Sequence, residues 1–153
     1  MRYYVVTFTH TKIVGWAVYL LAHIRYLKKL IKEDKLQISG PGVGTPVRSA
    51  QLVFKVTDQD ELDRLVAGDP YSEHGLVATK TENLWDVQVG KMTKAETPDP
   101  DGTKYFRAAY ALKQEIPADV RTKHDVYLNE LLQKKKIRAA GPYVNNPQAG
   151  FLQ

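Results

Sequence analysis

Along the N-terminal part of the chain, hydrophobic and polar positions change their period several times, and each change predicts a new element. Tyr3 to Thr9 is rich in β-branched and aromatic residues, which predicts a strand. From Val14 to Asp34 apolar residues recur at helical spacing, so we expect a long amphipathic helix. Leu36 to Ser39 predicts a short second strand, which ends at Gly40-Pro41.

The next segment predicts a third strand and a second, shorter helix. Gln51 to Val56 carries apolar side chains at every second position, as a strand with one buried face does. Thr57 has the position of an N-cap, and Asp60 stands at the third helical position of a capping-box-like pattern. We therefore expect a helix over Asp58 to Val66.

A turn and a last strand complete the unit. Asp69-Pro70-Tyr71 predicts a turn, and Leu76 to Val89 alternates well enough to predict a long strand. The resulting order is βαββαβ. The sequence thus predicts an α+β fold of the ferredoxin-like type, with both helices on one face of the sheet.

The pattern then restarts. Residues 91–102 are rich in charged residues and proline, which is linker composition. Lys104 to Ala111 predicts a strand, and Asp119 to Lys136 predicts a helix with Pro117 in its first turn. Ile137 to Ala140 predicts another short strand.

The two stretches align without a gap at a constant offset of 101 residues, as from His23 to His124. The positions that coincide include His23/His124, Tyr26/Tyr127, Leu27/Leu128, Leu30/Leu131, Gly40/Gly141 and Pro41/Pro142. We therefore predict a tandem duplication. A complete unit spans 1–90, a linker spans 91–102, and a partial second unit spans 103–153.

The second copy stops where its third strand begins, which predicts an unpaired sheet edge. Either another chain completes this copy, or the chain is a truncated product of a longer one. The expected arrangement of the two copies is an intrachain version of a dimer of such units.

Composition narrows the chemistry. The chain has 153 residues, a net charge of +5 and no cysteine, which excludes disulfides, thiol nucleophiles and all-thiolate zinc sites. No apolar run reaches the about 18 residues that span a bilayer, and we find no signal peptide. We expect a cytoplasmic protein that has no membrane partner.

The positive charge is concentrated near the ends of the two predicted helices. The two clusters are Lys28, Lys29, Lys32 and Lys35, and then Lys134, Lys135, Lys136 and Arg138. Cations at helix C-termini interact favourably with the helix dipole and stay solvated, so we favour this structural role. Nucleic acid is the less favoured partner.

Three short motifs together resemble the YciI-like family. They are His23-x-x-Tyr26-Leu27, Ser39-Gly40-Pro41 and Asp69-Pro70-Tyr71. The resemblance covers residues 2–90 and, as a partial copy, 103–153. It implies ferredoxin-like units that pair into dimeric α+β barrels, and hence a homo-oligomer.

The resemblance also implies a catalytic pair formed by His23 and Asp69, with Ser39 nearby. The physical argument agrees, because a histidine exchanges protons near neutral pH and a carboxylate fixes its tautomer. Ser39, Tyr71 and His10 are the candidate substrate-binding residues. The alternatives are a packed structural histidine, an Asp69 that only caps a turn and a Tyr71 that belongs to the core.

The second copy departs from this pattern. Ala140 replaces Ser39, and no counterpart of Asp69 exists. His124 is therefore either a vestige or a residue that works with a group from elsewhere.

The sequence gives little support to other chemistry. The four histidines lack the close spacing of a zinc site, and the Gly40-x-Gly42-x-Gly44 run does not precede a helix, so we expect no metal and no cofactor. The leading hypothesis is a small cofactor-independent isomerase or lyase that acts on a small ring compound. Relatives of this kind carry out dehydrochlorination or lactone isomerisation. The alternative is a non-catalytic small-molecule-binding or assembly module.

Overall fold

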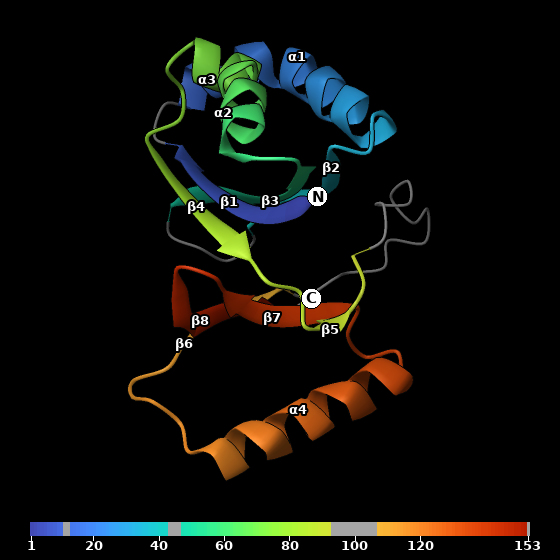
Figure 1. Ribbon diagram of the computed structural model, residues 1–153. Helices are drawn as coiled ribbons and strands as arrows, with labels where there is room; N and C mark the ends of the chain where they lie inside the picture. The colour runs from blue at the N-terminus through green and yellow to red at the C-terminus, as the bar shows by residue number, and fades with distance from the viewer. Residues whose placement is uncertain (11–12, 43–46, 93–106, 153) are drawn as a thin grey trace. The chain divides into compact units, whose positions relative to one another are not determined.

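The computed structural model describes residues 1–10, 13–42, 47–92 and 107–152 (Figure 1). The chain divides into two compact units, Met1–Asn83 and Leu84–Gln153. Most of the predicted linker at 91–102 lies outside the described residues. The domain boundaries predicted at residues 90 and 103 stay predictions.

The first unit contains an antiparallel sheet with the strand order β2-β3-β1-β4. Its strands are β1 (Arg2–His10), β2 (Leu36–Pro41), β3 (Arg48–Val56) and β4 (Thr79–Trp85), whose last residues belong to the second unit. Strand β1 pairs with both β3 and β4, so the first strand of the chain lies inside the sheet. This is the ferredoxin-like order, and the predicted α+β fold is confirmed for this unit.

Three helices lie over one face of this sheet (Figure 1). They are α1 (Ile13–Lys32), α2 (Gln59–Ala67) and α3 (Pro70–Glu73). The core between helices and sheet consists of fully buried apolar side chains, among them Phe8, Leu30, Leu52, Phe54, Leu62 and Tyr71. Their burial against one another holds α1 in the position that shapes the site.

Helix α1 ends in a Schellman-type cap. The N–H of Lys35 donates to the carbonyl of Leu30 at 2.9 Å, and the N–H of Asp34 donates to that of Ile31 at 3.2 Å. Asp34 adopts a left-handed conformation with φ of 61°. These bonds satisfy carbonyls that the helix leaves free, so the chain turns directly into β2.

The cap of α2 lies one residue later than predicted. Asp58, rather than Thr57, accepts the N–H of Glu61 at 2.8 Å. The Glu61 carboxylate in turn accepts the N–H of Thr57 at 2.7 Å. Asp58 is thus the N-cap, and Glu61 reaches back to the residue before it, so the box predicted from Thr57 and Asp60 is wrong.

The long last strand predicted over Leu76–Val89 is wrong. The structure has β4 (Thr79–Trp85) and a separate β5 (Val89–Gly90), and the Asp-Pro turn is the first turn of α3. The N–H of Leu76 donates to the carbonyl of Tyr71 at 2.8 Å and so belongs to the end of α3. Alternation in the sequence continues across these breaks, which is why it misled the prediction.

The second unit contains β5, β6 (Ala108–Ala111), α4 (Ala118–Gln133), β7 (Ala139–Tyr143) and β8 (Asn146–Leu152). Strand β7 pairs with β8 and β5, and β8 pairs with β6. Helix α4 packs its buried Leu128 in a small core that contains Val89, Ile137 and Ala140. The order β7-β8-β6 has the connectivity of β2-β3-β1, and the duplication stays a prediction.

Gly40-Pro41 ends β2, as predicted, whereas Gly141-Pro142 lies inside β7, beyond the end predicted for that strand at Ala140. Pro41 is the last residue of β2, which is an edge strand where a missing N–H is tolerated. Position 141 in β7 requires glycine, because the backbone carbonyl of Asp86 occupies the space that a Cβ would take. Glycine usually disfavours a strand, but Gly141 permits two backbones to approach each other closely.

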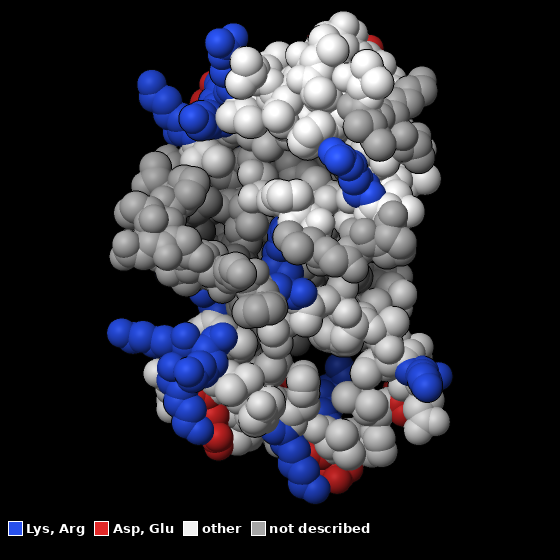
Figure 2. Space-filling model, turned by 180° about the vertical axis from the view of Figure 1, so that it is seen from behind, with Lys and Arg blue, Asp and Glu red and all other residues white. Residues whose placement is uncertain are grey.

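Basic side chains project at the C-terminal ends of α1 and α4 (Figure 2). Lys29 and Lys32 lie in the last turn of α1, and Lys134, Lys135 and Lys136 are exposed after α4. Cations here agree with the helix-dipole interpretation of the charge. None of the described helices has the length and apolarity needed to cross a membrane.

Candidate active site

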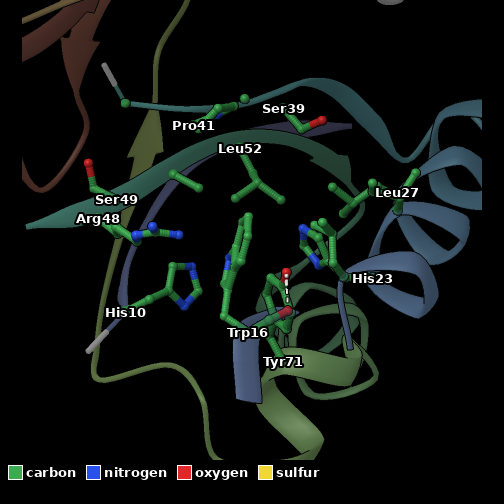
Figure 3. Close-up of a pocket in the computed structure, with 15 residues that line it drawn as sticks. His10, Trp16, His23, Leu27, Ser39, Pro41, Arg48, Ser49, Leu52 and Tyr71 are labelled. Carbon is green, nitrogen blue, oxygen red and sulfur yellow. Dashed lines mark hydrogen bonds between the residues drawn. The ribbon is translucent and has the colours of Figure 1, made fainter. Parts of the chain in front are cut away.

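A cavity of about 550 Å³ lies between α1 and the sheet of the first unit (Figure 3). The sheet side of this cavity follows from the pairing of the strands. Ser39 of β2 lies opposite Leu52 of β3, and His10 of β1 lies opposite Arg48 of β3. Paired residues share one face of a sheet, so all four side chains line the cavity.

The other side of the cavity is one face of α1. Trp16, Leu20, His23 and Leu27 line it, at successive spacings of four, three and four residues. This spacing puts the four side chains on a single stripe of the helix. Most of the wall is therefore apolar, and His23 is its polar member.

His23 contacts the carboxylate of Asp69. Its Nδ1 lies 2.9 Å from both Oδ1 and Oδ2. A carboxylate only accepts, so Nδ1 carries the hydrogen, and in the neutral imidazole Nε2 has the lone pair. The side chain of His23 is 13% exposed and lines the cavity, whereas Asp69 is buried and does not line it. Asp69 therefore lies behind the histidine, as an orienting group does.

Asp69 is held by the start of α3. It is the N-cap of that helix, and its Oδ1 accepts the N–H of Tyr71 at 2.9 Å. Pro70 occupies the first helical position, where its missing N–H costs nothing. The Asp-Pro-Tyr sequence thus aims a carboxylate at α1 through ordinary helix capping.

Tyr71 packs face to face with the imidazole of His23. The ring centroids are 4.1 Å apart at an angle of 14°. Its hydroxyl donates to the carbonyl of Trp16 at 3.2 Å. Burial, together with the charge of Asp69, raises the pKa of Tyr71 to about 12. Tyr71 therefore stays protonated near neutral pH and holds His23 in place rather than acting as a base.

His10 lies on the opposite side of Tyr71. Its ring meets that of Tyr71 edge to face at 5.3 Å, and its Nδ1 lies 3.2 Å from the carbonyl of Leu76. A carbonyl only accepts, so His10 also carries its hydrogen on Nδ1. His10 is 8% exposed and lines the cavity. Two imidazoles with the same tautomer thus border one cavity.

The structure brings together all five residues that the sequence singled out. His10, His23, Ser39 and Tyr71 line the cavity, and Asp69 contacts two of them. Their roles in catalysis and binding stay predictions.

Sequence reasoning missed Trp16 and Arg48. Arg48 lies with its Cζ 5.0 Å from the centre of the Trp16 ring (Figure 3). Trp16 precedes His23 by two helical turns, a spacing that would have placed both on one face. Arg48 lies four residues before Leu52 in β3, so the two-residue period of a strand would have placed both side chains on the same face.

The second unit has no comparable arrangement in the part of the chain that the structure describes. His124 is exposed on α4, and Tyr127 is 55% exposed. Ala140, at the position of Ser39, is buried in the small core beneath α4. No set of three described histidine, aspartate or glutamate side chains is grouped to hold a metal ion in either unit.

No curated protein matches the sequence. A solved structure of 5-chloro-2-hydroxyhydroquinone dehydrochlorinase (TftG) from Burkholderia phenoliruptrix AC1100, in complex with 2,5-dihydroxybenzoquinone, is similar to the chain with a TM-score of 0.47. The two are 24% identical, over 55% of this chain and 93% of that one. A family model for the YCII-related domain matches residues 17–81, from the first turns of α1 to the start of β4. This segment includes both His23 and Asp69, and residues 17–81 are therefore a YCII-related domain.

Proposed function

We propose that the first unit is a small cofactor-independent enzyme in which His23 transfers a proton and Asp69 orients it. The observation that carries this proposal is the contact of Nδ1 with the buried carboxylate of Asp69, at 2.9 Å to each oxygen. It leaves the basic nitrogen, Nε2, on the histidine that lines the cavity. A buried carboxylate that fixes the tautomer also stabilises the imidazolium formed when His23 accepts a proton.

The reaction class follows from what this pair can do without a nucleophile or a metal. Nε2 removes a proton from an acidic position of a bound ring compound. In an isomerase the same proton returns to another carbon of the ring. In a lyase the electron pair forms a double bond, a halide leaves, and the proton passes from His23 to water. Both classes agree with the family resemblance, and both need only general acid–base catalysis.

Proton exchange with solvent tests the proposal across several candidate substrates at once. The protein would be incubated in D₂O with unsaturated lactones, and with chlorinated dihydroxybenzenes in a parallel series. Deuterium uptake would be followed by mass spectrometry and chloride release by an ion-selective electrode. We expect turnover of at least one compound by the wild type and its loss in His23→Asn.

The tautomer of His23 is a second, independent readout. Long-range ¹H–¹⁵N correlation spectra distinguish the Nδ1–H and Nε2–H forms. We expect the Nδ1–H form in the wild type and a mixture in Asp69→Ala, because the acceptor that fixes the proton is then absent. Predominance of the Nε2–H form in the wild type would contradict the proposed geometry.

A non-catalytic binding module is the competing function, because the same cavity would serve it. Under that function, ring compounds bind but neither exchange protons nor lose chloride, and His23→Asn changes affinity alone. Assembly into a homo-oligomer is part of our proposal. Sedimentation equilibrium of the full chain tests it directly.

A further inference from the structure

The charge of the cavity wall is unbalanced. Arg48 is one of its lining residues, and none of the described lining residues is Asp or Glu. The carboxylate of Asp69 is buried behind His23 and Tyr71 and is engaged by both. A permanent cation at the edge of a largely apolar cavity favours an anionic ligand group.

Strand pairing fixes the backbone of Arg48, and its exposed side chain lies against Trp16. Arg48 is the first residue of β3 and is paired with His10 at the end of β1. Its Cζ lies 5.0 Å from the centre of the Trp16 ring, within the range of a cation–π contact. An exposed guanidinium beside an aromatic ring can also bind a carboxylate in a two-pronged manner through its N–H groups.

The rest of the wall suits a flat ring. Trp16 and Tyr71 supply aromatic surface, and Leu20, Leu27 and Leu52 supply aliphatic surface. The rings of Trp16 and Tyr71 are themselves nearly parallel, with centroids 6.1 Å apart and an angle of 30°. Such surfaces bury the faces of a small aromatic or unsaturated ring.

We propose that Arg48 is the specificity-determining residue of the cavity and that it selects ring compounds with a carboxylate. The carboxylate binds the guanidinium at the rim, and the ring extends along Trp16 towards His23. This inference names the substrate class of the proposed function. It rests on that function only in using the same cavity, and it does not require that His23 transfers a proton.

The test compares two ligands of nearly the same shape, the anion 4-hydroxybenzoate and the neutral 4-hydroxybenzamide. Calorimetric titration measures the affinity of the wild type, Arg48→Gln and Arg25→Gln. Arg25 is the matched control, because it is an exposed arginine of α1 that does not line the cavity. We expect the wild type and Arg25→Gln to prefer the carboxylate about tenfold, and Arg48→Gln to lose this preference.

Several results would overturn the inference. They are an equal preference in Arg48→Gln and wild type, no preference in the wild type, or no binding of 4-hydroxybenzoate at millimolar concentration. His23→Asn separates this inference from the proposed function. If His23→Asn still prefers the carboxylate and no variant exchanges protons, only the proposed function is contradicted. Proton exchange with a carboxylate-bearing ring compound at the same KM in Arg48→Gln and wild type would contradict the inference alone.

Discussion

Helices α1 and α4 carry the same short motif, and the structure surrounds the two copies differently. In α1, His23 meets a buried carboxylate and the ring of Tyr71. In α4, the histidine at the matching position, His124, is exposed. The motif therefore specifies a helix with one apolar side, while the chemistry depends on what lies across from that helix.

The tyrosines of the two motifs show what makes the difference. The hydroxyl of Tyr26 donates to the carbonyl of Leu65 in α2 at 2.8 Å, and burial raises its pKa. Tyr127 is 55% exposed, and no described helix of its unit covers it. Helices α2 and α3 thus create the environment of the first motif. The motif in α4 has no such helices beside it among the described residues, and it lacks the site.

The largest expected effect is the difference in activity between a variant of His23 and the matching variant of His124. Under the proposed function, His23→Asn lowers the rate of proton exchange by about 10²- to 10⁴-fold, the usual contribution of a general base. His124→Asn leaves the rate unchanged, because its side chain is exposed on α4. Deuterium uptake measures both. Equal losses in the two variants would show that the comparison is wrong.

Stability gives the next contrast. Asp69→Ala removes the N-cap of α3 and leaves two N–H groups without their acceptor, so we expect the free energy of unfolding to fall by about 3 kcal/mol. Asp125→Ala, on the exposed surface of α4, is expected to change it by less than about 0.5 kcal/mol. Urea unfolding followed by circular dichroism measures both changes.

The pH dependence of stability should also differ between the two copies. Lys35 pairs with Glu61, which also accepts the N–H of Thr57, and these contacts lower the pKa of Glu61 from its ordinary 4.5 to about 2. The fold thus favours the ionised form, so the contribution is complete above pH 4.5 and is lost as the pH falls towards 2. We expect about 1 kcal/mol after solvent screening.

The matched pair of variants is Lys35→Ala and Lys136→Ala. Lys136 stands at the position of Lys35 in the second copy and is exposed. Urea unfolding between pH 2 and 5 should show a shallower acid dependence in Lys35→Ala alone. A change of similar size in Lys136→Ala would mean that the second copy contains an ion pair of equal strength.

The smallest effect concerns the shared helix ends. Lys135 has a φ of 55°, close to the 61° of Asp34 in the first unit. Two corresponding backbone bonds close each turn. Lys135→Gly should stabilise the protein by about 1 kcal/mol, because glycine adopts this conformation without a steric cost. Asp34→Gly should gain less, since Asp34 also accepts from Gln37 at 3.0 Å and binds Lys55. Thermal unfolding ranks the two variants.

Period and capping signals were sufficient for most of the fold. The alternation of β3 and the helical spacing of α1 gave these elements, because each has one buried face. The region after Leu76 was not predictable in this way. There the chain alternates throughout, while its backbone bonds go first to the end of α3 and then, from Asp86 on, to β7.

The site was partly predictable. The three motifs identified His23, Asp69 and Ser39, and the βαββαβ order predicted helices on one face of the sheet. The register of β1 against β3 was not in the pattern, and it is this register that puts Arg48 opposite His10. Position-specific pairing comes from tertiary contacts, so a single sequence leaves it open.

The double use of Asp69 as cap and as histidine partner has a consequence for how the proposed activity would be lost. Helix α3 is only four residues long, so the loss of its cap at Asp69 is enough to unwind it. When it frays, the same event releases the imidazole from its fixed orientation. Mild heat or denaturant should therefore abolish the proposed activity before the sheet unfolds. Cooling should restore this activity without refolding of the whole chain. Inactivation and unfolding would then be two separate transitions.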